Sequence, residues 1–165
     1  KKQNKKDKKF RITDKGIQIF EFCGMSHTAD VVAMLNVSEM NPPDKKTADK
    51  NLVFVTYEGK AKRVNASLFD TSRKTAQAIK NGVVYVGYEG EYVVAETKNG
   101  YSIKVRSDEL PVQGKGAGGV TLISLRRGDL VENAISGGND TEFNGMKLSD
   151  MKAVKRGGKG NKKGK

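Results

Sequence analysis

The residue types that most often carry catalysis are scarce in this sequence. It holds one cysteine and one histidine, Cys23 and His27, four positions apart. Such a pair can act as nucleophile and base, or supply half of a metal site. Because a zinc site needs three or four ligands of this kind and no others are present, we interpret Cys23 as a small apolar strand residue and His27 as exposed. The sequence therefore predicts no catalytic residue, no metal site and no cofactor.

Two carboxylate pairs could in principle perform acid–base chemistry. Asp108 and Glu109 are neighbours, and adjacent residues of a strand point to opposite faces, which argues against their cooperation. Glu89 and Glu91 flank Gly90, in a pattern typical of a solvated turn. Neither pair is predicted to form a catalytic site.

Two glycine-rich basic segments could bind anions. The segment 114–119 (GKGAGG) can bring backbone N–H groups and one lysine close to an anion, but it lacks the GxxxxGK spacing of a triphosphate site. It is equally consistent with a wide connecting loop. The segment 155–160 (KRGGKG) alternates cations with glycines and is either a phosphate-binding element or a solvated tail. Since aromatic residues make up only 7% of the chain, backbone phosphates are a better target than stacked bases.

Charge is distributed unevenly along the 165 residues. The formal net charge is +12, from 31 Lys and Arg against 19 Asp and Glu. Seven basic residues lie within residues 1–11 and seven more within 152–165, so the stretch between them is nearly neutral. A polyanionic partner is indicated, and the body can contribute only through the arrangement of its charges over the surface.

Length and composition exclude several classes of protein. The chain has room for one domain or a row of small repeats. A single cysteine cannot form an internal disulfide, which favours a reducing cytoplasm. No apolar run approaches the roughly 20 residues of a membrane helix, so no membrane partner is predicted. The chain starts at Lys1 inside a lysine-rich stretch that is typical of a linker, and we expect it to be a fragment of a longer protein.

One sequence pattern occurs three times: an apolar run, a threonine, two polar residues, a glycine and a second alternating run. The copies are residues 10–20, 53–64 and 94–105, and their glycines, Gly16, Gly59 and Gly100, lie 43 and 41 positions apart. Each copy is typical of a β-hairpin that turns at its glycine. A period of about 40 to 45 residues is typical of four-stranded propeller blades.

The repeat predicts an all-β domain over residues 10–151, preceded by a basic linker (1–9) and followed by a basic Gly/Lys tail (152–165). Its units are expected at about 10–50, 51–91, 92–137 and, incompletely, 138–160. In the last unit Thr141 occupies the hairpin position and Gly145 follows four residues later. One unit alone buries too little to fold, so neighbours must share a core.

Three segments carry a likeness to a known family. They are GYSIKVRSDELPVQGKGAGGVTLISLRRGDLV (100–131), KRGGKG (155–160) and GKAKRV (59–64). Together they resemble the C-terminal domain of the A subunit of bacterial DNA gyrase and topoisomerase IV, over roughly residues 10–160. The resemblance implies a β-pinwheel, a propeller-like fold of three to four four-stranded blades here, with strands exchanged between neighbouring blades.

The resemblance also implies a function: binding and bending duplex DNA through phosphate contacts from a basic blade rim, in an ATP-dependent type IIA topoisomerase whose catalytic parts lie elsewhere. The implied partners are double-stranded DNA, the remainder of the A subunit, and its ATPase B subunit, in the bacterial cytoplasm. The rim candidates carried over by position are Lys60, Lys62, Arg63, Arg73 and Lys74 on the second unit, Lys104, Arg106 and Lys115 on the third, and Lys155, Arg156 and Lys159 in the segment 155–160.

Two other interpretations stay open from the sequence. The domain could be a propeller-like protein-interaction module whose basic tails alone bind nucleic acid. A hydrolase is disfavoured by the shortage of histidine and cysteine.

Overall fold

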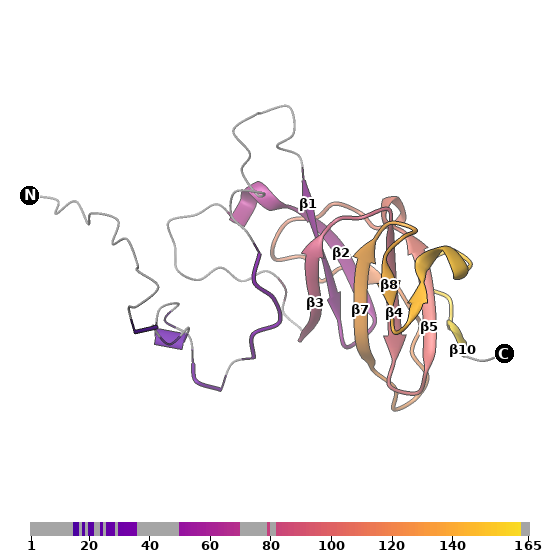
Figure 1. Cartoon of the computed structure of the whole chain (residues 1–165), viewed down its shortest axis with the longest axis horizontal. Helices are drawn as coiled ribbons and strands as arrows, with labels where there is room; N and C mark the ends of the chain where they lie inside the picture. The colour runs from indigo at the N-terminus through magenta and orange to yellow at the C-terminus, as the bar shows by residue number, and fades with distance from the viewer. Residues whose placement is uncertain are drawn as a thin grey trace, which may run out of the picture. The chain divides into compact units, whose positions relative to one another are not determined.

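The computed structural model describes residues 15, 16, 18, 20, 21, 24, 26–28, 30–35, 50–69, 79 and 82–162. The chain divides into two compact units, residues 1–30 and 31–165. The regular structure described in the second unit consists of strands and short 3-10 helices (Figure 1). The strands are β1 (Asn51–Thr56), β2 (Lys60–Asn65), β3 (Val83–Tyr88), β4 (Tyr92–Thr97), β5 (Tyr101–Arg106), β6 (Val120–Thr121), β7 (Val131–Gly137), β8 (Glu142–Phe143), β9 (Met146–Lys147) and β10 (Asn161–Lys162), and the 3-10 helices are η2 (Ala66–Phe69), η3 (Ser107–Glu109) and η4 (Leu148–Asp150).

Two antiparallel hairpins form the centres of two four-stranded sheets. The first sheet has the order β3-β1-β2-β6 and the second the order β10-β5-β4-β7. The hairpins β1–β2 and β4–β5 turn at Gly59 and Gly100, whose φ angles are 76° and 77°. Glycine adopts such positive φ angles at little energetic cost. The two predicted hairpin turns are therefore confirmed.

The outermost strand of each sheet comes from farther along the chain. β6 follows β5 in sequence, yet it pairs with β2 of the first sheet, where Lys60 lies opposite Thr121. β10 pairs in the same way with β5, so that Lys162 lies opposite Tyr101. The chain thus leaves the second sheet, adds a strand to the first, and returns as β7. Together with the four-stranded antiparallel sheets, this strand exchange confirms the predicted β-pinwheel fold.

The largest apolar cluster joins the two sheets. It contains Val53 and Val55 from β1, Val93 and Ala95 from β4, and Val131 at the start of β7, all without exposed surface. On β4, Val94 points the other way and packs with Phe143 and Leu148 beneath the β8–β9 hairpin. The second sheet is therefore buried on both faces. The other face of the first sheet is also buried, by a separate apolar cluster of Leu52, Phe54, Val64 and Ala66.

The repeat is regular at the 3-10 helices. They begin at Ala66, Ser107 and Leu148, each 41 residues after the last. The third hairpin is irregular as predicted, because it turns at Gly145, with φ 77°. This turn lies four residues later than the repeat predicts, whereas η4 begins at the position that the repeat predicts. As a result, β9 has two residues where β5 has six. The β8–β9 hairpin is therefore a shortened version of the hairpin in the second sheet.

The first copy of the pattern does not show the predicted turn. Gly16 lacks a positive φ, and Phe20 and Glu21 are helical rather than extended. The remaining residues of 10–20 lie largely outside the described residues, as does Cys23, while His27 is exposed as expected. In the part of the chain that the structure describes, no helix is long and apolar enough to cross a membrane.

Candidate nucleic-acid interface

Lys62, a predicted rim cation, is buried within the first sheet. It lies on β2 opposite Phe54, and none of its surface is exposed. Its ammonium group donates hydrogen bonds to the carbonyl oxygens of Gly114, Lys115 and Ala117, at 3.1, 2.6 and 2.7 Å. Burial lowers the pKa of Lys62, while these carbonyl oxygens favour the charged form. This placement argues against a phosphate contact, because the ammonium group binds the glycine-rich loop.

Lys104 is buried in a similar way within the second sheet. Its residue surface is 4% exposed, and its ammonium group donates to the carbonyl oxygen of Leu148 at 2.6 Å. The same nitrogen lies 3.8 Å from the centre of the Tyr92 ring. Lys104 therefore ties β5 to η4, which follows the shortened third hairpin, and its buried position argues against a phosphate contact. A strand lysine can face inward when its face is covered by another element, as Leu148 of η4 covers Lys104.

Two predicted arginines have carboxylate partners. The guanidinium of Arg63 is 2.6 Å from Glu89, and its Nε donates to the carbonyl oxygen of Leu110 at 2.6 Å. Arg106 is exposed and lies 3.1 Å from Asp108. The hydrogen bond from Arg106 holds the pKa of the Asp108 carboxyl below its usual range. The charges of both arginines are therefore compensated locally.

The remaining candidates of the second and third units occupy varied positions. Lys60 is half-buried on β2. The ammonium group of Lys115 donates to the carbonyl oxygen of Leu68 at 2.8 Å and lies 5.6 Å from the centre of the Phe69 ring. Arg73 and Lys74 lie outside the described residues.

The cations of residues 155–160 lie at the surface, on a loop that is hydrogen-bonded to residues 122–124, the segment after β6. Lys155, Arg156 and Lys159 are all exposed. The loop is attached by hydrogen bonds from Gly157 N–H to the carbonyl of Leu122 (2.7 Å) and from Ser124 N–H to the carbonyl of Gly158 (2.8 Å). β10 then completes the second sheet. Residues 155–162 are therefore part of the fold, and the alternative of a solvated tail does not apply to them.

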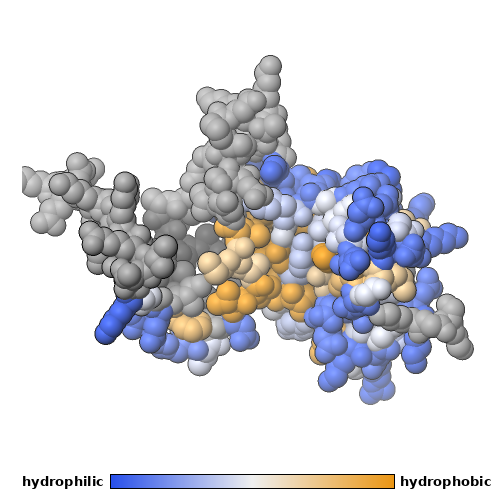
Figure 2. All heavy atoms as spheres, viewed as in Figure 1, coloured by the Kyte–Doolittle hydropathy of each residue, from blue (hydrophilic) through white to orange (hydrophobic). Residues whose placement is uncertain are grey.

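Further cations that the sequence reasoning missed lie beside this loop. The guanidinium of Arg126 donates to the carbonyl oxygen of Lys159 at 2.8 Å and lies 3.3 Å from the centre of the Tyr101 ring. Arg127 is exposed next to it, and Lys162 is exposed on β10. We call Arg126, Arg127, Lys155, Arg156, Lys159 and Lys162 the basic cluster. Figure 2 shows hydrophilic residues gathered at the end of the body that carries β5 and β10.

Two signals in the sequence could have located these residues. Arg126 and Arg127 begin the tetrapeptide Arg-Arg-Gly-Asp, which is typical of a tight turn, and the N–H of Asp129 does bond to the carbonyl of Arg126 at 3.0 Å. Lys162 lies 41 positions after Thr121, so the repeat places it on an exchanged strand.

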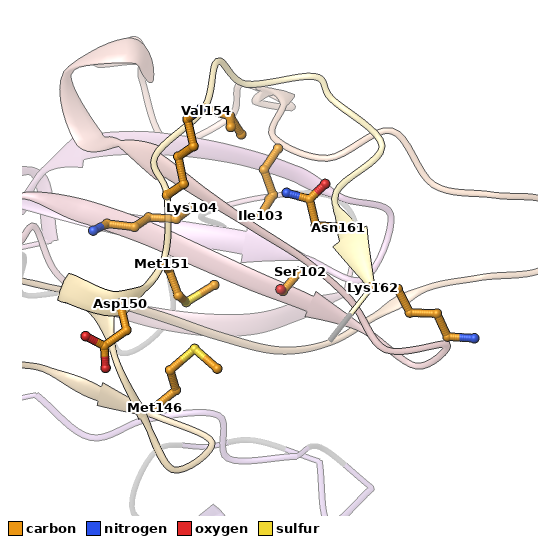
Figure 3. Close-up of a pocket in the computed structure, with 10 residues that line it drawn as sticks. Ser102, Ile103, Lys104, Met146, Asp150, Met151, Val154, Asn161 and Lys162 are labelled. Atoms are coloured by element: carbon orange, nitrogen blue, oxygen red, sulfur yellow. The ribbon is translucent and has the colours of Figure 1, made fainter. Parts of the chain in front are cut away.

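A small pocket lies between β5 and the shortened third hairpin. Its volume is about 200 Å³, and its apolar lining includes Ile103, Met146, Met151 and Val154. Figure 3 shows the two methionines facing each other across it, with the Lys104 and Lys162 side chains extending away. In the part of the chain that the structure describes, no group of three or more His, Cys, Asp or Glu side chains could hold a metal ion.

Comparison with known proteins agrees with this geometry. A family model described as DNA gyrase C-terminal domain, beta-propeller, matches residues 50–81 and 91–136. The A subunit of DNA gyrase from Lawsonia intracellularis (strain PHE/MN1-00) is 28% identical over 132 residues, covering 72% of this chain and 15% of that protein. The chain therefore spans only a small part of this relative.

Two solved structures have a similar fold. One is the crystal structure of the C-terminal domain of DNA topoisomerase IV, with a TM-score of 0.60 and 21% identity over 68% of this chain and 41% of that one. The other is the structure of the DNA gyrase A C-terminal domain, with a TM-score of 0.57 and 22% identity over 77% of this chain and 52% of that one.

Proposed function

Because the chain belongs to the family of DNA gyrase A C-terminal domains, we propose that it binds duplex DNA through phosphate contacts from the basic cluster and bends it. The observation that carries this proposal is the convergence of two loops and one exchanged strand at one end of the second sheet. Arg126 contacts the backbone of Lys159, and Lys162 lies opposite Tyr101, whose ring Arg126 covers. Cations gathered in this way can follow a phosphate backbone although the middle of the chain has no surplus positive charge.

Within the basic cluster, Lys155, Arg156 and Lys159 are the principal contacts in this proposal, since all three are exposed and lie on one glycine-rich loop. A second group of contacts in this proposal consists of Lys60, Arg73 and Lys74 from the second predicted unit and Arg106 from the third. Lys62, Lys104 and Lys115 have no part in it because their ammonium groups are bound to backbone carbonyls. Arg63 acts in this proposal as a structural residue that joins β2 to Glu89.

The proposed setting is the A subunit of a type IIA topoisomerase of the bacterial cytoplasm. The domain would present DNA to the remainder of that subunit, which would work with an ATPase B subunit. Catalysis would belong to those parts, so the chain studied alone should bind and bend DNA without cleaving it.

The salt dependence of duplex binding tests the phosphate contacts. The triple variant Lys155→Gln, Arg156→Gln, Lys159→Gln should bind more weakly, and the slope of log K against log salt should fall by about 0.9 for each phosphate contact that the substitutions remove. A matched control replaces three exposed lysines elsewhere, Lys50, Lys98 and Lys147, with Gln. An equal decrease of slope in both variants would show that net charge, rather than the basic cluster, drives binding.

Bending is tested separately, by energy transfer between dyes at the two ends of a short duplex. The transfer should rise on binding and should be reduced in the triple variant. Substitutions are preferable to deleting residues 152–165, because that deletion removes β10 from the second sheet. A chain that binds duplex without any rise in transfer would overturn the bending part of the proposal and favour an interaction module that only contacts DNA.

A further inference from the structure

The ring of Tyr101 lies close to two cations of the basic cluster, Arg126 and Lys162. Tyr101 is the first residue of β5 and pairs with Lys162 of the exchanged strand. The Arg126 guanidinium carbon lies 3.3 Å from the ring centre, and the Lys162 ammonium nitrogen lies 5.9 Å from it. Figure 3 shows the Lys162 side chain directed away from the pocket. The two charges are therefore no farther apart than the sum of these distances.

The first sheet provides an internal comparison. At the equivalent pair, where β6 meets β2, Lys60 lies opposite Thr121. This pair has neither an aromatic ring nor a cation on the exchanged strand. Because the same strand exchange forms with Lys and Thr at these positions, packing of the fold does not require Tyr101, Lys162 and their contacts with Arg126.

The geometry suits a phosphate better than a base. A guanidinium has five N–H donors, and the face of Arg126 is covered by the ring while one donor bonds to the Lys159 carbonyl. Stacking fixes the long side chain before binding, which reduces the entropy lost when its remaining donors meet phosphate oxygens. The ring face that Arg126 covers cannot stack on a base.

We propose that Tyr101 is a positioning residue that holds Arg126 and Lys162 as a two-cation clamp for one phosphate, or two neighbouring phosphates, of duplex DNA. This inference rests on the proposed function and adds to it residues that the family resemblance did not point to. It also assigns a role to an aromatic residue that carries no charge of its own.

A double-mutant cycle tests the clamp. Tyr101→Ser keeps the net charge, yet it should weaken duplex binding about fivefold because the cations lose their support. Tyr101→Phe keeps the ring and should bind like the unmodified chain. Arg126→Gln should lower the salt slope by about 0.9, and in that background Tyr101→Ser should have a much smaller further effect. Arg127→Gln serves as the matched control, since its effect should add independently to that of Tyr101→Ser.

Thermal unfolding of each variant separates positioning from folding, because the comparison uses only variants that remain folded at the binding temperature. If Tyr101→Ser is folded and binds as tightly as Tyr101→Phe, the clamp is overturned. The proposed function would fail in a different way, through absence of salt-dependent duplex binding by the unmodified chain. Binding by that chain that depends on Lys155, Arg156 and Lys159 but not on Tyr101 would overturn this inference alone.

Discussion

The loops 114–119 and 155–160 stand one repeat apart, and each leads into an exchanged strand, β6 or β10. Each loop ends in a glycine with a positive φ that lies close to a backbone carbonyl. Gly119 and Gly160 have φ angles of 80° and 68°, and a Cβ on each would lie 2.8 Å from the Ala61 carbonyl oxygen and 2.9 Å from that of Ser102. The cations of the two loops, however, have different surroundings.

At the first loop, the lysine ammonium groups bind backbone carbonyls of the protein itself. The Lys62 ammonium group binds three of the loop's carbonyls, and Lys115 folds back onto the Leu68 carbonyl. One repeat later the position of Lys62 is taken by Ile103, which is buried and apolar. The second loop holds no inserted ammonium group from this position, and its own cations are exposed. A basic glycine-rich loop is thus a candidate DNA contact only where its charges are not needed to hold the loop.

The largest effect is expected from removing the buried ammonium group. Lys62→Met leaves the carbonyls of Gly114, Lys115 and Ala117 without their donor, so the free energy of unfolding should fall by about 2–4 kcal/mol. Denaturant titration measures this change. The matched change in the second loop, Lys155→Met, affects an exposed side chain and should stay within about 0.5 kcal/mol.

In DNA binding, Lys155→Met should have the larger effect of the same two variants. Lys155→Met should reduce the salt slope, whereas folded Lys62→Met should keep it. A stable Lys62→Met chain with a reduced slope would show that the lysine contacts phosphate after all, and the distinction between the loops would fail.

A smaller loss of stability is expected at the two glycines that precede the exchanged strands. Gly119→Ala and Gly160→Ala each place a Cβ at positive φ, which costs about 1–2 kcal/mol, and against a backbone carbonyl as well. Both should therefore destabilise the chain to a similar extent in denaturant titrations. Gly116→Ala is the control, because its Cβ meets nothing within 4 Å and its φ is not positive. If only one of the two glycines is sensitive, the loops are not structurally equivalent.

Much of the fold could be predicted from the sequence because its signals are local. Gly59 and Gly100 mark tight turns between alternating strands, and their spacing sets the repeat. The exchange of β6 and β10 is not a local property, since it depends on which edge a two-residue strand meets. Only the family resemblance predicts it.

The site was harder to predict because charge alone does not report exposure. The two-residue period of β2 places Lys62 on the same face as Val64, which indicated burial, but the carbonyl acceptors come from residues more than 50 positions away. The burial of Lys104 depends on Leu148 of η4, which lies 44 positions later in the sequence. Arg126 and Lys162 were missed because they meet on Tyr101 only when the exchanged strand is in place.

The native carboxylate of Glu109 lies next to the second loop and should weaken DNA binding modestly. Glu109 accepts a hydrogen bond from the Arg156 N–H at 3.1 Å, whereas the first loop has Leu68 at the equivalent position. Glu109→Gln keeps an acceptor but removes a negative charge, so duplex affinity at low salt should rise about twofold to threefold. Binding titrations at low and high salt measure the change, which should shrink as salt screens it. An affinity that falls would show that the carboxylate is needed to shape the loop.

The smallest effect concerns Arg106, an exposed cation whose charge is compensated by Asp108. The Arg106 hydrogen bond holds the pKa of Asp108 below its usual range, so the pair contributes stability above the unfolded-state pKa and loses it as pH falls through the lower folded-state value. In a carboxyl NMR titration, Arg106→Gln should move the Asp108 midpoint upward, toward its usual range. The effect on stability should be slight because both side chains are more than half exposed. A midpoint that does not move would mean that the pair does not persist in solution, and Arg106 could then contact phosphate without competition from Asp108.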